Sequence, residues 1–217
     1  MTNTLAAPRL DAVLDRMFAA AARDEDHAPA PPAGRTSWAT PLERAEAYQD
    51  IYIPISAEAG KLLYALVRAG RPETVVEFGT SFGISTIYLA AAVTDNGAGH
   101  VVTTELSTAK AEAARSNLRQ AGVSEAVTIL VGDARQTLGE VSGPVGLVLL
   151  DGWKDLCLPV LRQLEPKLAP GALVAADDIT NPGMAGYLDY IRDPANGYVS
   201  VAFPVEDGME ISSWTRA

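Results

Sequence analysis

The chain has 217 residues and a formal net charge of −10, from 17 basic and 27 acidic residues. This acidic balance argues against a nucleic-acid surface, which needs a basic stripe, and against a polybasic membrane patch. Hydrophobic residues make up 48% of the chain, so it can bury the core of one α/β domain. We therefore expect no nucleic-acid or membrane partner, and a small substrate that is uncharged or cationic.

The chain shows none of the features of a secreted or membrane protein. Its first residues lack a basic stretch followed by a long apolar stretch. No apolar run approaches the ~20 residues of a membrane span. The single cysteine, Cys157, cannot form an intramolecular disulfide and is expected to be a buried helix residue. These features predict a cytoplasmic protein.

The N-terminal part of the chain is expected to be helical but interrupted. Apolar periodicity predicts helices over residues 10–22, 42–48 and 58–69. A linker rich in Asp, Ala and Pro follows the first helix at residues 23–34, and Pro54 holds the apolar stretch IYIPIS extended. We therefore separate residues 1–36, as a lid or as the arm of a homodimer, from a main domain at residues 37–217.

Strand and helix patterns alternate from Glu73 onwards. Strands are expected at residues 74–79, 100–105, 126–133, 147–152, 172–178, 198–205 and 209–216, and helices at residues 85–93, 108–121, near Gln136, 155–168 and 186–191. Glu206, Asp207 and Gly208 give a hairpin signal between the last two strands. The alternation predicts a Rossmann-like, doubly wound, seven-stranded α/β sheet, mostly parallel with an antiparallel last strand, plus N-terminal helices.

Three acidic residues end two of the apolar strands. Asp151 follows the run LVLL, and Asp177 and Asp178 follow the run ALVAA. Ligands of open α/β sheets bind outside the carboxyl ends of the strands, where these carboxylates would meet and repel each other. Oxygen-only ligands suit Mg²⁺, Mn²⁺ or Ca²⁺ rather than zinc. Lys154, three residues after Asp151, would place a base beside this cation.

A glycine loop and two further acids indicate a cofactor cleft at the same edge. Gly79 and Gly83 follow the first predicted strand, but their spacing departs from G-x-G-x-x-G. The missing pyrophosphate cradle favours a nucleoside-like cofactor without phosphates. Glu105 ends the second strand, where a carboxylate can accept both ribose hydroxyls, and Asp133 ends the third, where it could meet an adenine edge. Either acid could also be an ordinary helix cap.

The segments LLDGWKDLCLP, LVAADD and DGME, together with the glycine loop, resemble class I S-adenosylmethionine-dependent methyltransferases. More narrowly, they resemble the metal-dependent catechol O-methyltransferase family and its caffeoyl-CoA relatives, from about Ile53 to Glu210. By this resemblance S-adenosylmethionine should contact Ile55, Glu77, Gly79, Ser85, Glu105, Asp133, Ala134 and Asp151. Asp151, Asp177 and Asp178 should bind Mg²⁺, or else Mn²⁺ or Ca²⁺. Lys154 should be the general base, and Trp38, Trp153, Lys154 and Glu210 should contact the substrate. Asp178 departs from the family, which usually carries Asn there.

The resemblance implies an O-methyltransferase that acts on a small catechol-type substrate, a vicinal dihydroxy aromatic compound. Residues 35–56 and 181–197 should shape its acceptor pocket. Three other interpretations stay open at this point. The acids could be structural in a metal-independent methyltransferase, the sheet could serve a nucleotide-linked oxidoreductase, or the fold could be a non-catalytic binding module.

Overall fold

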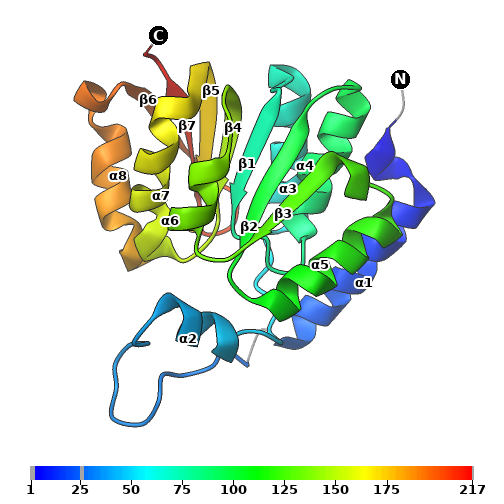
Figure 1. Cartoon of the computed structure of the whole chain (residues 1–217), viewed down its shortest axis with the longest axis vertical. Helices are drawn as coiled ribbons and strands as arrows, with labels where there is room; N and C mark the ends of the chain where they lie inside the picture. The colour runs from blue at the N-terminus through cyan, green and yellow to red at the C-terminus, as the bar shows by residue number, and fades with distance from the viewer. Residues whose placement is uncertain (1–2, 25–26, 217) are drawn as a thin grey trace.

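The computed structural model describes residues 3–24 and 27–216 and contains a seven-stranded sheet (Figure 1). The strands follow the order β3-β2-β1-β4-β5-β7-β6. Their bounds are β1 Thr74–Phe78, β2 His100–Glu105, β3 Val127–Val131, β4 Val145–Leu150, β5 Leu168–Ala176, β6 Tyr198–Phe203 and β7 Met209–Trp214. Strand β7 runs antiparallel to both β5 and β6, whereas β1 to β5 pair in parallel. The predicted fold class is confirmed.

The register of the central strands brings their carboxyl ends to one level. Phe78 at the end of β1 lies opposite Thr104 of β2 and Leu150 of β4, and Leu150 lies opposite Ala176 of β5. The residues that follow these strand ends therefore share one edge of the sheet. The chain leaves β1 towards β2 and β3 and then returns to β4, so a switch point lies between β1 and β4, where open α/β sheets bind their ligands.

Helices cover both faces of the sheet (Figure 1). They are α1 Pro8–Asp24, α2 Pro41–Ala47, α3 Ala57–Gly70, α4 Ile84–Asn96, α5 Thr108–Ala121, α6 Ala134–Thr137, α7 Cys157–Leu164 and α8 Ala185–Arg192. Buried side chains of α1, α3, α4 and α5 form one core cluster with the sheet, and those of α6, α7 and α8 form the other. Cys157 is fully buried in the second cluster, as expected of a helix residue.

Helix α1 packs against its own domain. Leu10 and Met17 are fully buried, and Arg9 donates hydrogen bonds to the carbonyl oxygens of Arg119 and Gln120 at the end of α5, at 3.0 and 2.7 Å. The apolar face of this helix is thus buried without a second copy of the chain. A role of residues 1–36 as a lid or dimer arm stays a prediction. Residues 25–26 of the predicted linker lie outside the described residues.

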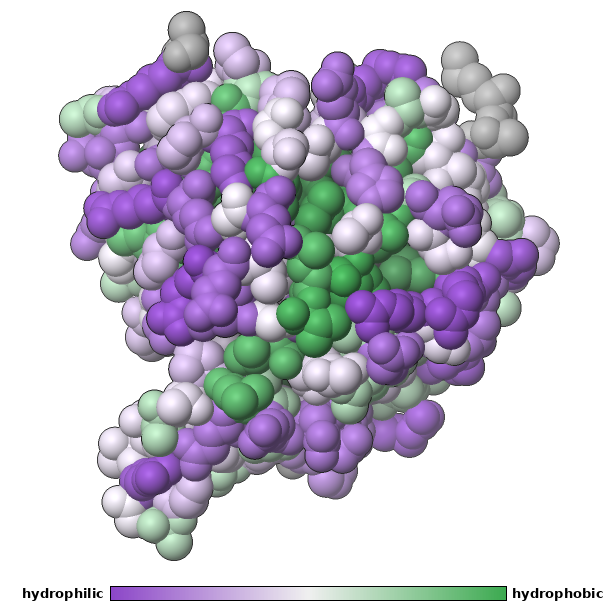
Figure 2. Space-filling view, in the orientation of Figure 1, coloured by the Kyte–Doolittle hydropathy of each residue, from purple (hydrophilic) through white to green (hydrophobic). Residues whose placement is uncertain are grey.

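Residues 27–56 form a segment that projects beyond the carboxyl edge of the sheet and carries α2 (Figure 1). Thr40 caps α2, because its hydroxyl accepts a hydrogen bond from the backbone amide of Glu43 at 3.0 Å. A band of hydrophobic residues crosses the face shown in Figure 2 and reaches this segment, in which Leu42 and Ile53 are large exposed hydrophobic residues. The described part of the chain contains no helix with the length and hydropathy that a membrane crossing requires.

Candidate active site

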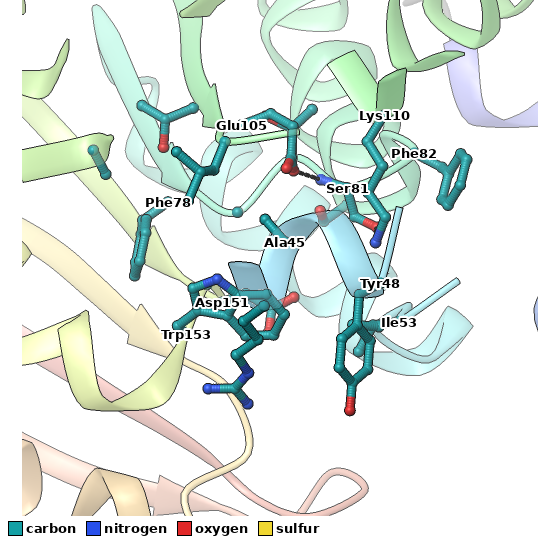
Figure 3. A pocket seen from close by; sticks show the side chains of 18 of the residues that line it. Ala45, Tyr48, Ile53, Phe78, Ser81, Phe82, Glu105, Lys110, Asp151 and Trp153 are labelled. Atoms are coloured by element: carbon teal, nitrogen blue, oxygen red, sulfur yellow. Dashed lines mark hydrogen bonds between the residues drawn. The ribbon is translucent and has the colours of Figure 1, made fainter. Parts of the chain in front are cut away.

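A cavity of about 380 Å³ lies between the carboxyl edge of the sheet and the segment that carries α2. Its walls come from the glycine loop after β1, the ends of β2 and β4, the loop after β3, and residues of α2 (Figure 3). The sequence-predicted residues that line it are Ile55, Gly79, Ser85, Glu105, Asp133, Ala134, Asp151, Trp153, Lys154 and Asp178. The fold therefore gathers most of the predicted cofactor, metal and base residues around one space.

The glycine loop is pressed against the end of β4. Gly79 has a φ of +107°, and a Cβ atom added there would lie 2.7 Å from the carbonyl oxygen of Asp151. Only glycine combines that backbone conformation with so close an approach. The amide of Asp151 in turn donates to the carbonyl oxygen of Phe78 at 2.9 Å. This contact places the glycine loop directly beside the acid cluster.

Glu77 lies beneath the cavity rather than in its wall. Its side chain is fully buried and accepts hydrogen bonds of 2.5 Å from the hydroxyls of Ser85 and Thr86 at the start of α4. Burial raises the pKa of Glu77 to about 7, although these hydroxyl donors act to lower it. Glu77 therefore fixes Ser85, which does line the cavity.

Replacing Glu77 with Gln should remove a pH dependence of stability. Because the pKa is about 7 in the folded protein and 4.5 in the reference state, the folded state binds more protons between these values. The wild-type free energy of unfolding should therefore fall as the pH rises from 4.5 to 7, and stay low above it. Urea unfolding at about pH 4 and pH 8 should show Glu77→Gln gaining on the order of 3 kcal/mol relative to wild type at the higher pH. If the free energies of unfolding of Glu77→Gln and wild type differ by the same amount at both pH values, the pH dependence does not arise from Glu77.

Glu105 is held in place by the loops on either side of it. Its carboxylate accepts the backbone amides of Ser81 at 2.7 Å and of Ser107 at 2.8 Å (Figure 3). Burial raises the pKa of Glu105, whereas these amides and the Lys110 ammonium lower it. The side chain faces the cavity at the end of β2, as the ribose prediction requires.

Lys110 in the first turn of α5 is a cavity residue that the sequence analysis missed. It is only 4% exposed, its Nζ atom lies 3.3 Å from the hydroxyl of Ser81, and it faces the ring of Phe82 at 5.2 Å (Figure 3). Burial lowers the pKa of Lys110 to about 8. The N-terminus of a helix carries a partial positive charge, which disfavours a cation in the first turn. A lysine at this position was the feature of the sequence that could have identified it as a site residue.

Asp133 acts as a helix cap, one of the alternatives that its position allowed. Its carboxylate accepts the backbone amide of Arg135 at 2.9 Å and pairs with the Arg135 guanidinium at 2.6 Å. The guanidinium holds the pKa of Asp133 below its usual value. Asp133 and Ala134 also line the cavity, so the cap does not exclude the predicted cofactor contact.

Asp151, Asp177 and Asp178 form a compact oxygen-ligand cluster. One carboxylate oxygen from each lies within 4.8 Å of the others. Burial and the Asp151 carboxylate raise the pKa of Asp177 to about 8, and burial also raises the pKa of Asp151. Asp178 adopts a φ of +56°, a conformation that Asp and Asn tolerate best among non-glycine residues. Carboxylates that are costly to ionise together fit a divalent cation, which would bind their charged forms.

Lys154 neutralises part of this cluster. Its ammonium lies 2.8 Å from an oxygen of Asp151 and 3.1 Å from an oxygen of Asp178. Burial alone would lower the pKa of Lys154, but the Asp151 and Asp178 carboxylates outweigh it and raise the pKa. In this arrangement the lysine is protonated, and it can lose its proton only when another cation takes over the carboxylates.

Aromatic residues line the outer side of the cluster. Tyr48 packs edge-on against Trp153 with ring centroids 5.6 Å apart, and Trp38 packs edge-on against Tyr48 at 6.4 Å. The guanidinium of Arg44, on α2, lies 3.9 Å from the centre of the Trp153 ring. Trp153 lines the main cavity, whereas Trp38 lines a second, outer cavity that also contacts Trp153.

The structure places Glu210 away from the cavity. Glu210 is 1% exposed on β7, and its carboxylate forms two hydrogen bonds with Arg192 at 2.9 and 2.7 Å. Its carboxylate lines neither cavity, and the predicted substrate contact of Glu210 stays a prediction. Glu206, in the hairpin before β7, accepts a hydrogen bond from the backbone amide of Ser56 at 2.8 Å, and its charge adds to burial in raising the pKa of Asp151 and Asp177.

Comparisons with known proteins place this site in context. Residues 76–179 match a family model described as a methyltransferase domain. The chain is 36% identical over 132 residues to the catechol O-methyltransferase of Mycobacterium tuberculosis, an alignment that covers 60% of this chain and 59% of that protein. Among solved structures it is similar to cofactor-bound Rv0187 from MTB, with a TM-score of 0.71 and 28% identity over 82% of this chain and 90% of that one.

A second solved structure is similar over almost the whole length. It is the O-methyltransferase TomG from Streptomyces achromogenes, in complex with SAM, with a TM-score of 0.67, 25% identity and coverage of 94% of this chain and 99% of that one. The curated relatives are matched less completely, because the chain spans 59%, 64% and 65% of the first three. The matched family region, residues 76–179, includes the glycine loop and all three clustered acids.

Proposed function

Since the chain belongs to the S-adenosylmethionine-dependent O-methyltransferases of the catechol and caffeoyl-CoA family, we propose that it methylates one hydroxyl of a small vicinal dihydroxy aromatic compound with the help of a divalent cation. One observation carries this proposal. Gly79 of the cofactor loop lies against the backbone of Asp151, so the methyl donor and the acid cluster would share one cavity.

The cofactor would lie along the carboxyl ends of β1, β2 and the loop after β3. Glu105 would accept the ribose hydroxyls, and Asp133 and Ala134 would border the adenine ring. Ile55, Gly79 and Ser85 would border the rest of the molecule. When bound, S-adenosylmethionine supplies a methyl group on a sulfonium, which is already a strong electrophile. The protein must therefore provide orientation and an ionised nucleophile.

The acid cluster and Lys154 would provide that nucleophile. Asp151, Asp177 and Asp178 would hold Mg²⁺, or else Mn²⁺ or Ca²⁺, and the bound cation would lower the pKa of a phenol whose free value is ~10. With a cation bound to the carboxylates that hold its ammonium, Lys154 would give up its proton to solvent and, once neutral, would accept the phenol proton at Nζ, which lies 2.8 Å from Asp151. Trp153 would pack beside the acceptor ring, because it follows Asp151 by two residues and lines the same cavity.

A second candidate is a metal-independent small-molecule methyltransferase. The ion pairs of Lys154 with Asp151 and Asp178 favour it, because they compensate two of the three acids without a cation. The direct test incubates the protein with a panel of vicinal diphenols, S-adenosylmethionine and Mg²⁺, and follows the gain of one methyl group by mass spectrometry. Methylation that persists after chelation supports the second candidate, and no methylation of any diphenol would sink the first.

Cofactor binding can be tested separately from turnover. Glu105→Ala should weaken the calorimetric affinity for S-adenosylmethionine by at least about tenfold, because it removes a charged hydrogen-bond acceptor from the ribose. Glu58→Ala is a matched control, since the side chain of Glu58 is 72% exposed on α3. NAD should give no binding heat with wild type, and measurable NAD binding would favour an oxidoreductase.

A further inference from the structure

Arg44 borders both cavities beside the acid cluster. Helix α2 holds its guanidinium 3.9 Å from the centre of the Trp153 ring. Arg44 and Trp153 line the main cavity, and both also line the outer cavity of about 470 Å³, together with Trp38 and Asp155. An acceptor whose hydroxyls reach the acid cluster past Trp153 would therefore extend towards Arg44.

The polar groups of Arg44 are poorly satisfied. Its Nε atom is buried and has no hydrogen-bond partner among the described residues. The acid paired with it in the described part of the chain is Asp155, at 3.7 Å, whose side chain is 66% exposed. An unsatisfied buried donor costs roughly 1–3 kcal/mol. The loose pair with Asp155 leaves the guanidinium able to accept a different anion.

The other cations of the main cavity are already engaged. Lys154 pairs with Asp151 and Asp178 at 2.8 and 3.1 Å. Lys110 lies at the cofactor end, beside Ser81 and in the field of Glu105. Among the described residues that line the main cavity, Arg44 is therefore the cation positioned to bind a charged group of the acceptor.

Resting on the function proposed above, we propose that Arg44 binds a carboxylate of the acceptor, so that the preferred substrates are acidic catechols. A planar guanidinium binds a carboxylate through two parallel hydrogen bonds. A single guanidinium with Asp155 beside it matches one negative charge rather than the two of a phosphate. The net charge of −10 pointed to an uncharged or cationic substrate, but a contact this close is governed by the local cation.

The test uses pairs of acceptors in which a methyl ester replaces the carboxylate and so removes its charge. Protocatechuate and its methyl ester form one pair, and caffeate and its methyl ester form the other. Wild type should show a kcat/KM for each acid at least about tenfold above that for its ester, which corresponds to about 1.4 kcal/mol. Arg44→Gln should lower this acid-to-ester ratio at least about tenfold, and Arg44→Lys, which keeps the charge, should restore part of it.

The Arg35→Gln variant separates recognition of the carboxylate by Arg44 from general effects on the packing of residues 27–56. Arg35 falls in the stretch that the sequence predicts to shape the acceptor pocket, but in the structure it pairs with Glu43 at 2.9 Å and lines neither cavity. This control should leave the acid-to-ester ratio unchanged. An Arg44→Gln variant that lowers both kcat/KM values by the same factor, or a wild type that prefers the esters, would overturn the proposal.

A failure of the proposed function remains distinguishable from a failure of this inference. If no diphenol is methylated, the methyl-transfer proposal fails. Calorimetric titration of protocatechuate and its ester into protein saturated with S-adenosylhomocysteine then decides the inference. Tighter binding of the acid that is lost in Arg44→Gln supports it, and equal binding of the two compounds overturns it.

Discussion

Replacing Lys154 with Ala should lower turnover of a catechol by a factor of about 10² to 10⁴, the range typical of a lost general base. Nζ of Lys154 lies 2.8 Å from Asp151 and 3.1 Å from Asp178, next to the oxygens that would hold the metal. An acceptor hydroxyl at the metal would therefore lie within reach of Nζ. Affinity for S-adenosylmethionine should change little, because Glu105, the proposed ribose contact, ends a different strand and is held by Ser81 and Ser107.

Lys154→Arg tests the base role itself. Arginine keeps the positive charge beside Asp151 and Asp178, but it does not lose its proton in proteins. Both Lys154→Arg and Lys154→Ala should therefore be slow in single-turnover assays with saturating cofactor. The exposed Lys61→Ala is the control for loss of a lysine. Full turnover by Lys154→Arg would show that Lys154 acts through its charge alone, and full turnover by Lys154→Ala would remove it from the mechanism.

The acid cluster could be predicted from the sequence because strand ends are easy to recognise. Asp151 and Asp177 follow apolar runs that are buried on both sides, and parallel strands end at one edge of the sheet. The same rule predicts that Glu105 and Asp133 lie at this edge, because each comes at or just after the end of a parallel strand. In the structure, the register of β1, β4 and β5 brings these strand ends to one level. The rule that parallel strands end at one edge is therefore enough to predict the cluster.

Contacts between distant elements could not be predicted in the same way. Arg44 reaches Trp153 from a short helix whose position depends on how residues 27–56 cross the edge of the sheet. Glu210 lies opposite Ala176 of β5, the residue before Asp177, yet its side chain lines neither cavity. The pairing of Glu210 with Arg192, from the end of α8, likewise depends on packing between two elements.

Removing divalent cations should abolish most of the activity, and adding Mg²⁺ back should restore it. The expected loss exceeds about a hundredfold, because an uncoordinated phenol with a pKa of ~10 is largely protonated at neutral pH and loses the cation's stabilisation of its oxyanion. Activity after treatment with EDTA, followed by titration with Mg²⁺, Mn²⁺ and Ca²⁺, measures this directly. Asp178→Asn is the informative variant, since Asn also tolerates the φ of +56° found there and removes one negative charge. It should weaken the apparent affinity for the metal about tenfold while leaving the fold intact.

Lys154 and the metal should compete for the same carboxylates, and this competition separates the two candidate functions. In the absence of a cation, Lys154 compensates Asp151 and Asp178, so Lys154→Ala should leave Asp177, whose pKa is raised to about 8, among uncompensated acids. Mg²⁺ should therefore raise the Tm of Lys154→Ala more than that of wild type, because the stabilisation by a bound ligand grows with the logarithm of its affinity. An enzyme whose acids are only structural would show no such difference, and its activity would survive chelation. A larger Mg²⁺-induced rise in Tm for the variant, together with activity lost on chelation, would instead identify the three acids as a metal site that Lys154 occupies until the cation binds.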